Sequence, residues 1–446
     1  MKPIPLYYSI IFTCVLSACT SFEDVTFNQQ ADFQLTQLAN AKIENKTSSM
    51  TLMQLFSISE VDVLIENALN HNPNLQQTLL TLKKAKQRYT VTSSDQWPNI
   101  TANVNSKKVE DTNTAYTGSI DIAWTIDFWQ KLANASDAEQ ANVSATAFAY
   151  QGAKDLLAAN IISAYLDLVQ LSQLIEIESQ RVLTFKRNEQ VIVSRYKKGL
   201  KSLNELDTAK SNTQSSEATL IEHKAQYQQS LRNISLLTGL QKNQITSQVQ
   251  FPKIILPLSE IDADRIGQRP DLQQAYQDIK YSQYQHKVAY KALLPNISLS
   301  ASISNSQSNL HDALFGSQAW QLLGQLSAPL FNAGKLTSEV EIAKLSAEQS
   351  YWSFQETLLK AVNEVDNAIA QEYAIVAQLT LIKSALASAK RSEITYTERY
   401  RQGTTSYIDL LQIQQQTFSL QTQVTQLTYQ HLSNRISLGL ALGLGI

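Results

Sequence analysis

Residues 116–128 read YTGSIDIAWTIDF, and large apolar residues recur at every second position through most of this stretch. A period of two places alternate side chains on opposite faces, which predicts a β-strand with one apolar and one polar face. The apolar face would carry Tyr116, Gly118, Ile120, Ile122, Trp124, Ile126 and Phe128. Three more stretches have this pattern, although Leu323 interrupts one polar face. We therefore predict strands at about 99–105, 116–128, 296–305 and 319–331.

Strands of about ten residues with an apolar side and a Ser/Thr/Asn/Gln side are typical of transmembrane β-barrels. Trp124, Trp129 and Trp320 lie near predicted strand ends, where interfacial aromatic residues are common. The loops 106–115 and 305–318 would be hairpin tips outside the cell. A soluble sandwich is the alternative, but it needs a second apolar face that we do not find in the sequence.

Four strands are too few for a closed barrel, because the smallest barrels have about eight. An open sheet edge in lipid would leave backbone polar groups without hydrogen-bond partners. The chain must therefore supply part of a barrel that several copies build together.

Long stretches with few helix breakers follow each predicted strand pair. Residues 132–198 contain no proline and one glycine, and residues 336–402 contain neither. A helix of this length would be roughly 100 Å long, at about 1.5 Å per residue. Gly199 and Gly403 would then turn the chain into a returning helix, which makes one αα-hairpin in each half. A plain coiled coil is the alternative, but it does not account for the interposed strands.

The two halves of the chain repeat one plan. NHNPNLQQT at 70–78 matches GQRPDLQQA at 267–275, and RYKKG at 195–199 matches RYRQG at 399–403. The offset grows from 197 to 204, which one seven-residue insertion in the strand region of the second half explains. The match indicates an internal duplication.

The domain organisation follows from this duplication. We predict a first repeat at 59–240, a linker at 241–259 and a second repeat at 260–446, each ordered helix–strand–strand–long helix–helix. Pro73 and Pro270 suit the first position of a helix. Asn72 can cap that helix directly, whereas Arg269 cannot.

The N-terminus, MKPIPLYYSIIFTCVLSACT, has a basic start, an apolar run and small residues, which is typical of a secretory signal. Its Leu16–Cys19 sequence, LSAC, resembles the lipobox of bacterial lipoproteins. We expect a signal peptide at 1–18, a periplasmic segment at 19–58, and a covalent lipid on Cys19 in place of any cofactor. An ordinary signal peptide with an incidental cysteine is the alternative.

Several functions find no support in the composition. The formal net charge of −2 indicates no surface for nucleic acid. The histidines show no metal-binding spacing; they are His71, His223, His286, His311 and His431. No glycine-rich phosphate loop occurs. We predict neither a metal site nor catalytic residues, and hence no enzyme.

The chain resembles the TolC-like outer membrane factors, in particular the lipoprotein (NodT-type) branch used with resistance–nodulation–division pumps. The resemblance rests on Cys19 and on four phrases: RPDL at 269–272, LPNISLS at 294–300, YKKGL at 196–200 and YRQGT at 400–404. It implies a mainly α-helical homotrimer in the outer membrane of a Gram-negative bacterium. Its four strands per chain would form a 12-stranded β-barrel, which a periplasmic α-helical barrel continues.

The resemblance also implies a passive exit duct that opens on contact with a periplasmic adaptor and an inner-membrane pump. The adaptor would touch the hairpin tips at Gly199, Leu200, Gly403 and Thr404. Type I protein secretion and, further off, a periplasmic coiled-coil scaffold are the alternatives. The lipobox favours efflux.

The family pattern at the second tip has Tyr, Gly, Arg and two Asp residues one helical turn apart. Tyr400 and Asp409 match, Thr405 replaces the Arg, and Gln412 replaces the second Asp. In a trimer, three Asp409 carboxylates could face one another across a narrow pore and attract cations. The alternative is a solvated carboxylate on an outer face.

Overall fold

The computed structural model describes residues 25–40, 51–55, 59–245, 250–252 and 263–446. The signal peptide, Cys19 and most of the predicted linker lie outside these residues. The described chain divides into two compact units. One contains the sheet and the helical segments next to it, and the other contains the helical hairpins.

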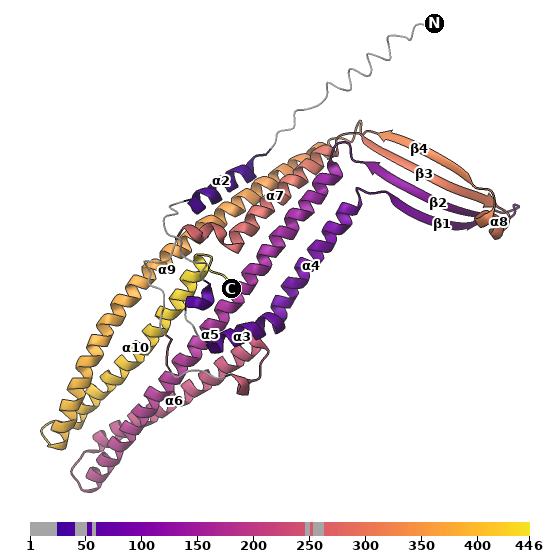
Figure 1. The fold of residues 1–446 in the computed structure, drawn as a ribbon. Coiled ribbons are helices and arrows are strands. Elements are labelled where there is room, and N and C mark those ends of the chain that lie inside the picture. The colour runs from indigo at the N-terminus through magenta and orange to yellow at the C-terminus, as the bar shows by residue number, and fades with distance from the viewer. Residues whose placement is uncertain (1–24, 41–50, 56–58, 246–249, 253–262) are drawn as a thin grey trace, which may run out of the picture. The chain divides into compact units, whose positions relative to one another are not determined.

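Four antiparallel strands form one sheet in the order β1-β2-β3-β4 (Figure 1). They are β1 (Asn99–Lys107), β2 (Ala115–Ile126), β3 (Asn296–Gln307) and β4 (Ala319–Ser327). Asp121 pairs with Thr101 on one side and with Ser302 on the other, so polar residues share a face across the strands. The apolar residues share the opposite face, as the period of two predicts. The sheet is open, with β1 and β4 at its edges.

Two strands end earlier than predicted. β2 stops at Ile126 instead of 128, because the Phe128 N–H turns back to the Ile126 carbonyl at 2.9 Å. The Asp127 carboxylate then accepts a hydrogen bond from the Ala133 N–H at 2.8 Å, near the start of the next helix. β4 stops at Ser327 instead of 331, since Pro329 has no N–H to give to a ladder.

Two strands run further than predicted, and one loop contains a helix. β1 extends to Lys107 and β3 to Gln307. The loop after β3 forms α8 (Leu310–Phe315), which the sequence did not predict. Asn309 caps it, because its side chain accepts a hydrogen bond from the Asp312 N–H at 2.8 Å.

Long helices follow the strands as the lack of breakers predicts. α5 (Lys131–Lys197) and α9 (Lys335–Arg401) each have 67 residues. α6 (Leu203–Thr238) and α10 (Tyr407–Ala441) return from their ends. α4 (Pro73–Ser94) and α7 (Pro270–Lys291) begin at the two predicted prolines and lead to the strands. The shorter elements are α2 (Phe27–Asn40), η1 (Leu52–Leu55), α3 (Ser59–His71), η2 (Lys242–Gln244) and η4 (Ala263–Gln268).

The helical unit has its main core where α3, α5, α6 and α10 meet. Ile65, Leu166, Ile234 and Ile436 are buried there around Tyr165. Burial of such side chains contributes about 1.5–3 kcal/mol each. This packing holds the two hairpins of one chain together.

The repeated phrase marks an equivalent joint in both repeats. Asn72 accepts a hydrogen bond from the Leu75 N–H at 3.0 Å, so it caps α4 as predicted. Its amide also donates to the Leu237 carbonyl at 3.0 Å, at the end of α6. Arg269 donates to the Ala441 carbonyl at 3.1 Å, at the end of α10. Leu237 and Ala441 are 204 residues apart, so the two joints are equivalent.

The Arg269 side chain contacts more elements than the Asn72 side chain does. Its side chain is 8% exposed and forms a two-point contact with Asp271, at 3.1 and 2.8 Å. It also pairs with Glu364 of α9 at 2.7 Å. The arginine thus ties the start of α7, the end of α10 and the middle of α9, and its positive charge suits the C-terminus of α10.

Candidate functional site: the hairpin tips

The two hairpin tips have the same backbone turn. Gly199 and Gly403 adopt φ values of 73° and 76°, which a residue with a side chain rarely tolerates. In the first tip, the Leu200 N–H donates to the Arg195 carbonyl at 2.9 Å. In the second, the Thr404 N–H donates to the Arg399 carbonyl at 2.9 Å. This is the Schellman end of a helix, and it gives α5 and α9 the same sharp exit.

The two hairpins of one chain pack together just behind the tips. Tyr407, the first residue of α10, is 1% exposed. It lies in a small core with Phe185 and Ile192 of α5 and with Leu206 and other residues of α6 and α10. The contact is apolar and local, so it defines one end of the interface between the hairpins.

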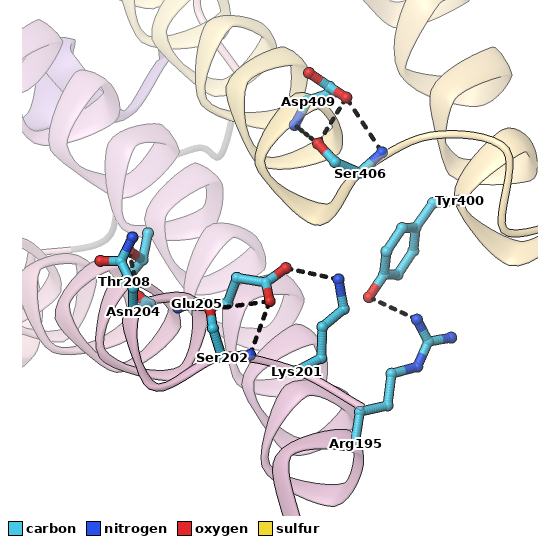
Figure 2. A network of polar contacts seen from close by, with 9 residues as sticks. All are labelled: Arg195, Lys201, Ser202, Asn204, Glu205, Thr208, Tyr400, Ser406 and Asp409. Atoms are coloured by element: carbon cyan, nitrogen blue, oxygen red, sulfur yellow. Dashed lines mark hydrogen bonds and ion pairs between the residues drawn. The ribbon is translucent and has the colours of Figure 1, made fainter. Parts of the chain in front are cut away.

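Arg195 and Tyr400 connect the tips in front of this core. Figure 2 shows the two side chains pointing toward one another, and the Arg195 guanidinium donates to the Tyr400 hydroxyl at 3.3 Å. The guanidinium also lies 5.1 Å from the centre of the Tyr400 ring, within the range of a cation–π contact. The sequence singled out Tyr400 but not its partner.

The Tyr407 hydroxyl lies next to this tie. It is buried and makes no hydrogen bond with any part of the chain that the structure describes. Burial, together with the neighbouring Tyr400 and Glu189, raises the pKa of Tyr407 to about 12. A buried hydroxyl without a partner costs about 1–3 kcal/mol, so this group weakens the contact in which it lies.

Asp409 is part of the cap of α10. Its carboxylate accepts hydrogen bonds from the Ser406 hydroxyl at 2.6 Å and from the Ser406 N–H at 3.1 Å (Figure 2). The Ser406 hydroxyl in turn accepts from the Asp409 N–H at 3.2 Å, which completes a capping box. These donors, with the Thr405 hydroxyl, hold the pKa of Asp409 below its ordinary value. The carboxylate is exposed and charged.

The first repeat has the same cap at the same place. Ser202 and Glu205 form a capping box at the start of α6, and Lys201 pairs with Glu205 at 2.6 Å (Figure 2). The patterns Ser-x-x-Glu at 202–205 and Ser-x-x-Asp at 406–409 indicate such boxes from sequence alone. The resemblance to the family pattern assigned Asp409 to the gate, so its capping role was not predicted.

The structure brings some predicted residues together and leaves others apart. Tyr400 is half-buried beside Arg195, whereas Asp409 and Gln412 are exposed on α10. Gly199, Gly403 and Thr404 are exposed at the tips with Leu200, which is 68% exposed. The tips therefore offer accessible surface, and the gate and adaptor-contact roles of these residues stay predictions.

No group of three or more His, Cys, Asp or Glu side chains within the described residues could hold a metal ion. None of the helices in the described part of the chain has both the length and the apolarity to cross a membrane.

Comparison with known proteins identifies the class. The chain belongs to the outer membrane efflux protein family, whose model matches residues 64–240 and 264–444. As a member it is an outer-membrane channel that forms trimers, works with a periplasmic adaptor and an inner-membrane pump, and is not an enzyme. The predicted family and location are thereby confirmed.

The relatives agree with this assignment. The cation efflux system protein CusC of Escherichia coli K12 is 24% identical over 425 residues, with 93% of each chain covered. Nodulation protein T of Rhizobium leguminosarum bv. trifolii is 24% identical over 396 residues, with 85% of each covered. The chain is thus similar to the NodT-type branch that the sequence indicates.

Solved structures confirm the predicted fold class. The CmeC outer membrane channel of Campylobacter jejuni superposes with a TM-score of 0.84 at 20% identity, and the alignment covers 92% of each chain. A crystal structure of CusC gives a TM-score of 0.82 at 22% identity, covering 90% of this chain and 96% of that one.

Proposed function

We propose that this channel is the exit duct of a resistance–nodulation–division pump and that its hairpin tips are the gate. The observation that carries the gate is the hydrogen bond between Arg195 and Tyr400. It joins α5 to α9 through side chains alone, next to the glycine turns that end both helices. Such a tie is weak enough to break when a partner binds.

The surroundings of the tie support this role. Leu200 and Leu203 are both more than half exposed at the first tip, and neighbouring exposed apolar groups are suited to a protein contact. An adaptor that binds the turns at Gly199, Leu200, Gly403 and Thr404 would pull on α5 and α9 where Arg195 and Tyr400 meet. Separation of the tips would then open the duct.

Asp409 has two roles in this proposal. Within one chain it caps α10. In the trimer, three Asp409 carboxylates would face the pore and favour cations, while Gln412 would add no charge. The hydrogen bonds from Ser406 and Thr405 lower the pKa of Asp409, which favours the ionised form that such a ring requires.

The cargo follows the pump in this proposal. The relatives carry names as different as cation efflux system protein, pyoverdine export outer membrane protein and toluene efflux pump outer membrane protein. A conduit whose partner selects the cargo is consistent with that range. The test is a deletion strain exposed to drugs, detergents and metal salts. Restoration of tolerance by the wild-type gene supports the proposal, and unchanged tolerance to every agent contradicts it.

We also propose that Cys19 carries a lipid that anchors the mature chain in the outer membrane. A relative from Salmonella typhimurium is named a probable outer membrane lipoprotein, SilC, at 24% identity. Mass spectrometry of the mature N-terminus would find a diacylglyceryl thioether and an N-acyl chain on Cys19. An unmodified N-terminus, or cleavage elsewhere, would contradict the anchor but not the channel.

A further inference from the structure

The helix α8 (Leu310–Phe315) lies on one defined face of the sheet, at the end where the strands are joined in hairpins (Figure 1). A Cβ atom built on Gly118 of β2 would come within 2.9 Å of the Leu314 side chain and 3.0 Å of the Ala313 carbonyl. The helix therefore occupies the space toward which a side chain at position 118 would point. Glycine at this position gives α8 room to pack.

A second contact places α8 on the same face. Asn305 of β3 is the register partner of Gly118, so their side chains point the same way. The Asn305 amide donates to the Asp312 carbonyl of α8 at 2.6 Å. Two neighbouring strands thus fix the side of the sheet on which the helix lies.

This face is the apolar one. Successive residues of a strand alternate between faces, so Gly118 shares its face with Ile120, Ile122 and Trp124. The opposite face carries Asp121 and most of the other polar residues of β2 and β3, and in a closed transmembrane barrel this polar face would line the lumen. The helix α8 therefore lies on the lipid-facing side of the sheet and not over the mouth of the pore.

The height of α8 can be estimated from β2. Ten residue steps separate Tyr116 from Ile126. At about 3.3 Å per step and a strand tilt of about 40°, they span roughly 25 Å, the height of the apolar band of such barrels. Gly118 is two steps from the outer end of this span, so α8 lies at the outer boundary of the apolar band.

The outward side of α8 suits a lipid interface. Phe315 is 75% exposed and Leu310 is 46% exposed, while Ala313 is buried against the sheet. Trp320, on the same face of β4, is 79% exposed. Asn309 and Asp312 form the polar cap of the helix. Aromatic and apolar side chains beside polar ones are typical of the headgroup boundary.

Another copy of the chain is a less suitable partner for this surface. The helix packs against β2 and β3, the central strands, whereas neighbouring copies join at the edge strands β1 and β4. The apolar surface of α8 is also continuous with the lipid-facing side of the sheet. Lipid is therefore the partner that the position of the helix favours.

We propose that α8 is an interfacial anchor that inserts Phe315 and Leu310 among the lipids of the outer leaflet and leaves the pore mouth open. The proposal rests on the membrane location of the sheet and is independent of the gate and the cargo.

The test uses the intact trimer in phosphatidylcholine vesicles. A Phe315→Cys variant is labelled with an environment-sensitive fluorophore. Wild-type protein treated with the same fluorophore shows whether Cys19 takes up label. We expect quenching by a nitroxide carried near the lipid headgroups and protection from aqueous iodide. Matched labels are placed at Asn113→Cys in the first hairpin loop and at Gln325→Cys on the polar face. We expect iodide to quench these labels and the lipid nitroxide not to quench them.

A label at position 315 that iodide quenches, and that the lipid nitroxide does not, would overturn the proposal. A Gly118→Leu variant adds a second reading, because its side chain would displace α8 and increase iodide quenching of the label at 315. Unchanged quenching in a folded Gly118→Leu trimer would also count against the packing on this face. Pump-dependent export by these variants would be scored separately, since the gate does not depend on α8.

Discussion

Replacement of Tyr400 by Phe removes one hydroxyl from the tie between the hairpin tips and keeps the ring. The lost hydrogen bond has a charged donor, and such bonds contribute about 1.5–3 kcal/mol. At 3.3 Å and partly exposed, this bond is weaker than that range and contributes about 1 kcal/mol per chain, as a typical neutral hydrogen bond does. The cation–π contact with Arg195, at 5.1 Å, would remain.

The effect is multiplied in the trimer. If the three tips separate together, the closed state loses about 3 kcal/mol, or roughly a hundredfold in the ratio of closed to open channels. Arg195→Ala also removes the cation–π contact, which adds about 0.5–1 kcal/mol per chain. We therefore expect more frequent opening in the order wild type, Tyr400→Phe, Arg195→Ala.

Single-channel recording of purified trimers in planar bilayers measures this directly. The matched control is Tyr196→Phe, because Tyr196 occupies the equivalent position in the first repeat, 204 residues earlier. It takes no part in the Arg195–Tyr400 contact, so its open probability is expected to equal that of the wild type. If the Arg195→Ala trimer has normal stability and the open probability of the wild type, the Arg195–Tyr400 contact is not part of the gate.

Four further changes test other parts of the structure. Tyr407→Phe removes a buried hydroxyl that has no hydrogen-bond partner in the described chain. The closed state should gain about 1–3 kcal/mol per chain, so we expect fewer openings; more openings would contradict this. Asp409→Asn keeps a capping oxygen but loses the charge, so we expect weaker block of the channel by divalent cations; block at the wild-type level would show that Asp409 only caps α10. Arg269→Gln breaks the pairs with the start of α7 and with α9, and we expect a loss of about 1–3 kcal/mol, seen as earlier thermal dissociation of the trimer; an unchanged midpoint would show that the joint is not structural. Asp121→Asn removes a carboxylate from the polar face of the sheet, and the ratio of potassium to chloride permeability is expected to fall; an unchanged reversal potential would place Asp121 outside the ion path.

Local patterns in the sequence predicted most of the elements. The ends of α5 and α9 agree within one residue with the breaker-free stretches, because a helix continues until a glycine turn stops it. The strand faces follow from the period of two. Errors lie at strand ends and in α8, whose six residues carry too little periodicity to distinguish a helix from a loop.

The gate could be predicted only in part. Tyr400 and Asp409 were found by resemblance, and the capping box at 406–409 was readable from Ser-x-x-Asp. Arg195 was not found, because its contact with Tyr400 spans 205 positions and depends on how two hairpins pack. The unpaired hydroxyl of Tyr407 likewise results from burial by residues of three helices.

The sequence by itself determined the duplication, the faces of the strands and the length of the helices, because these depend on residue spacing along one segment. Only the tertiary structure decided what the repeated phrase does. Asn72 meets Leu237, 165 positions away, and Arg269 meets Ala441, 172 positions away. The phrase therefore joins the helix that leads to the strands, α4 or α7, to the returning helix of the same repeat, α6 or α10. Such contacts depend on packing in three dimensions, so short stretches of sequence do not encode them separately.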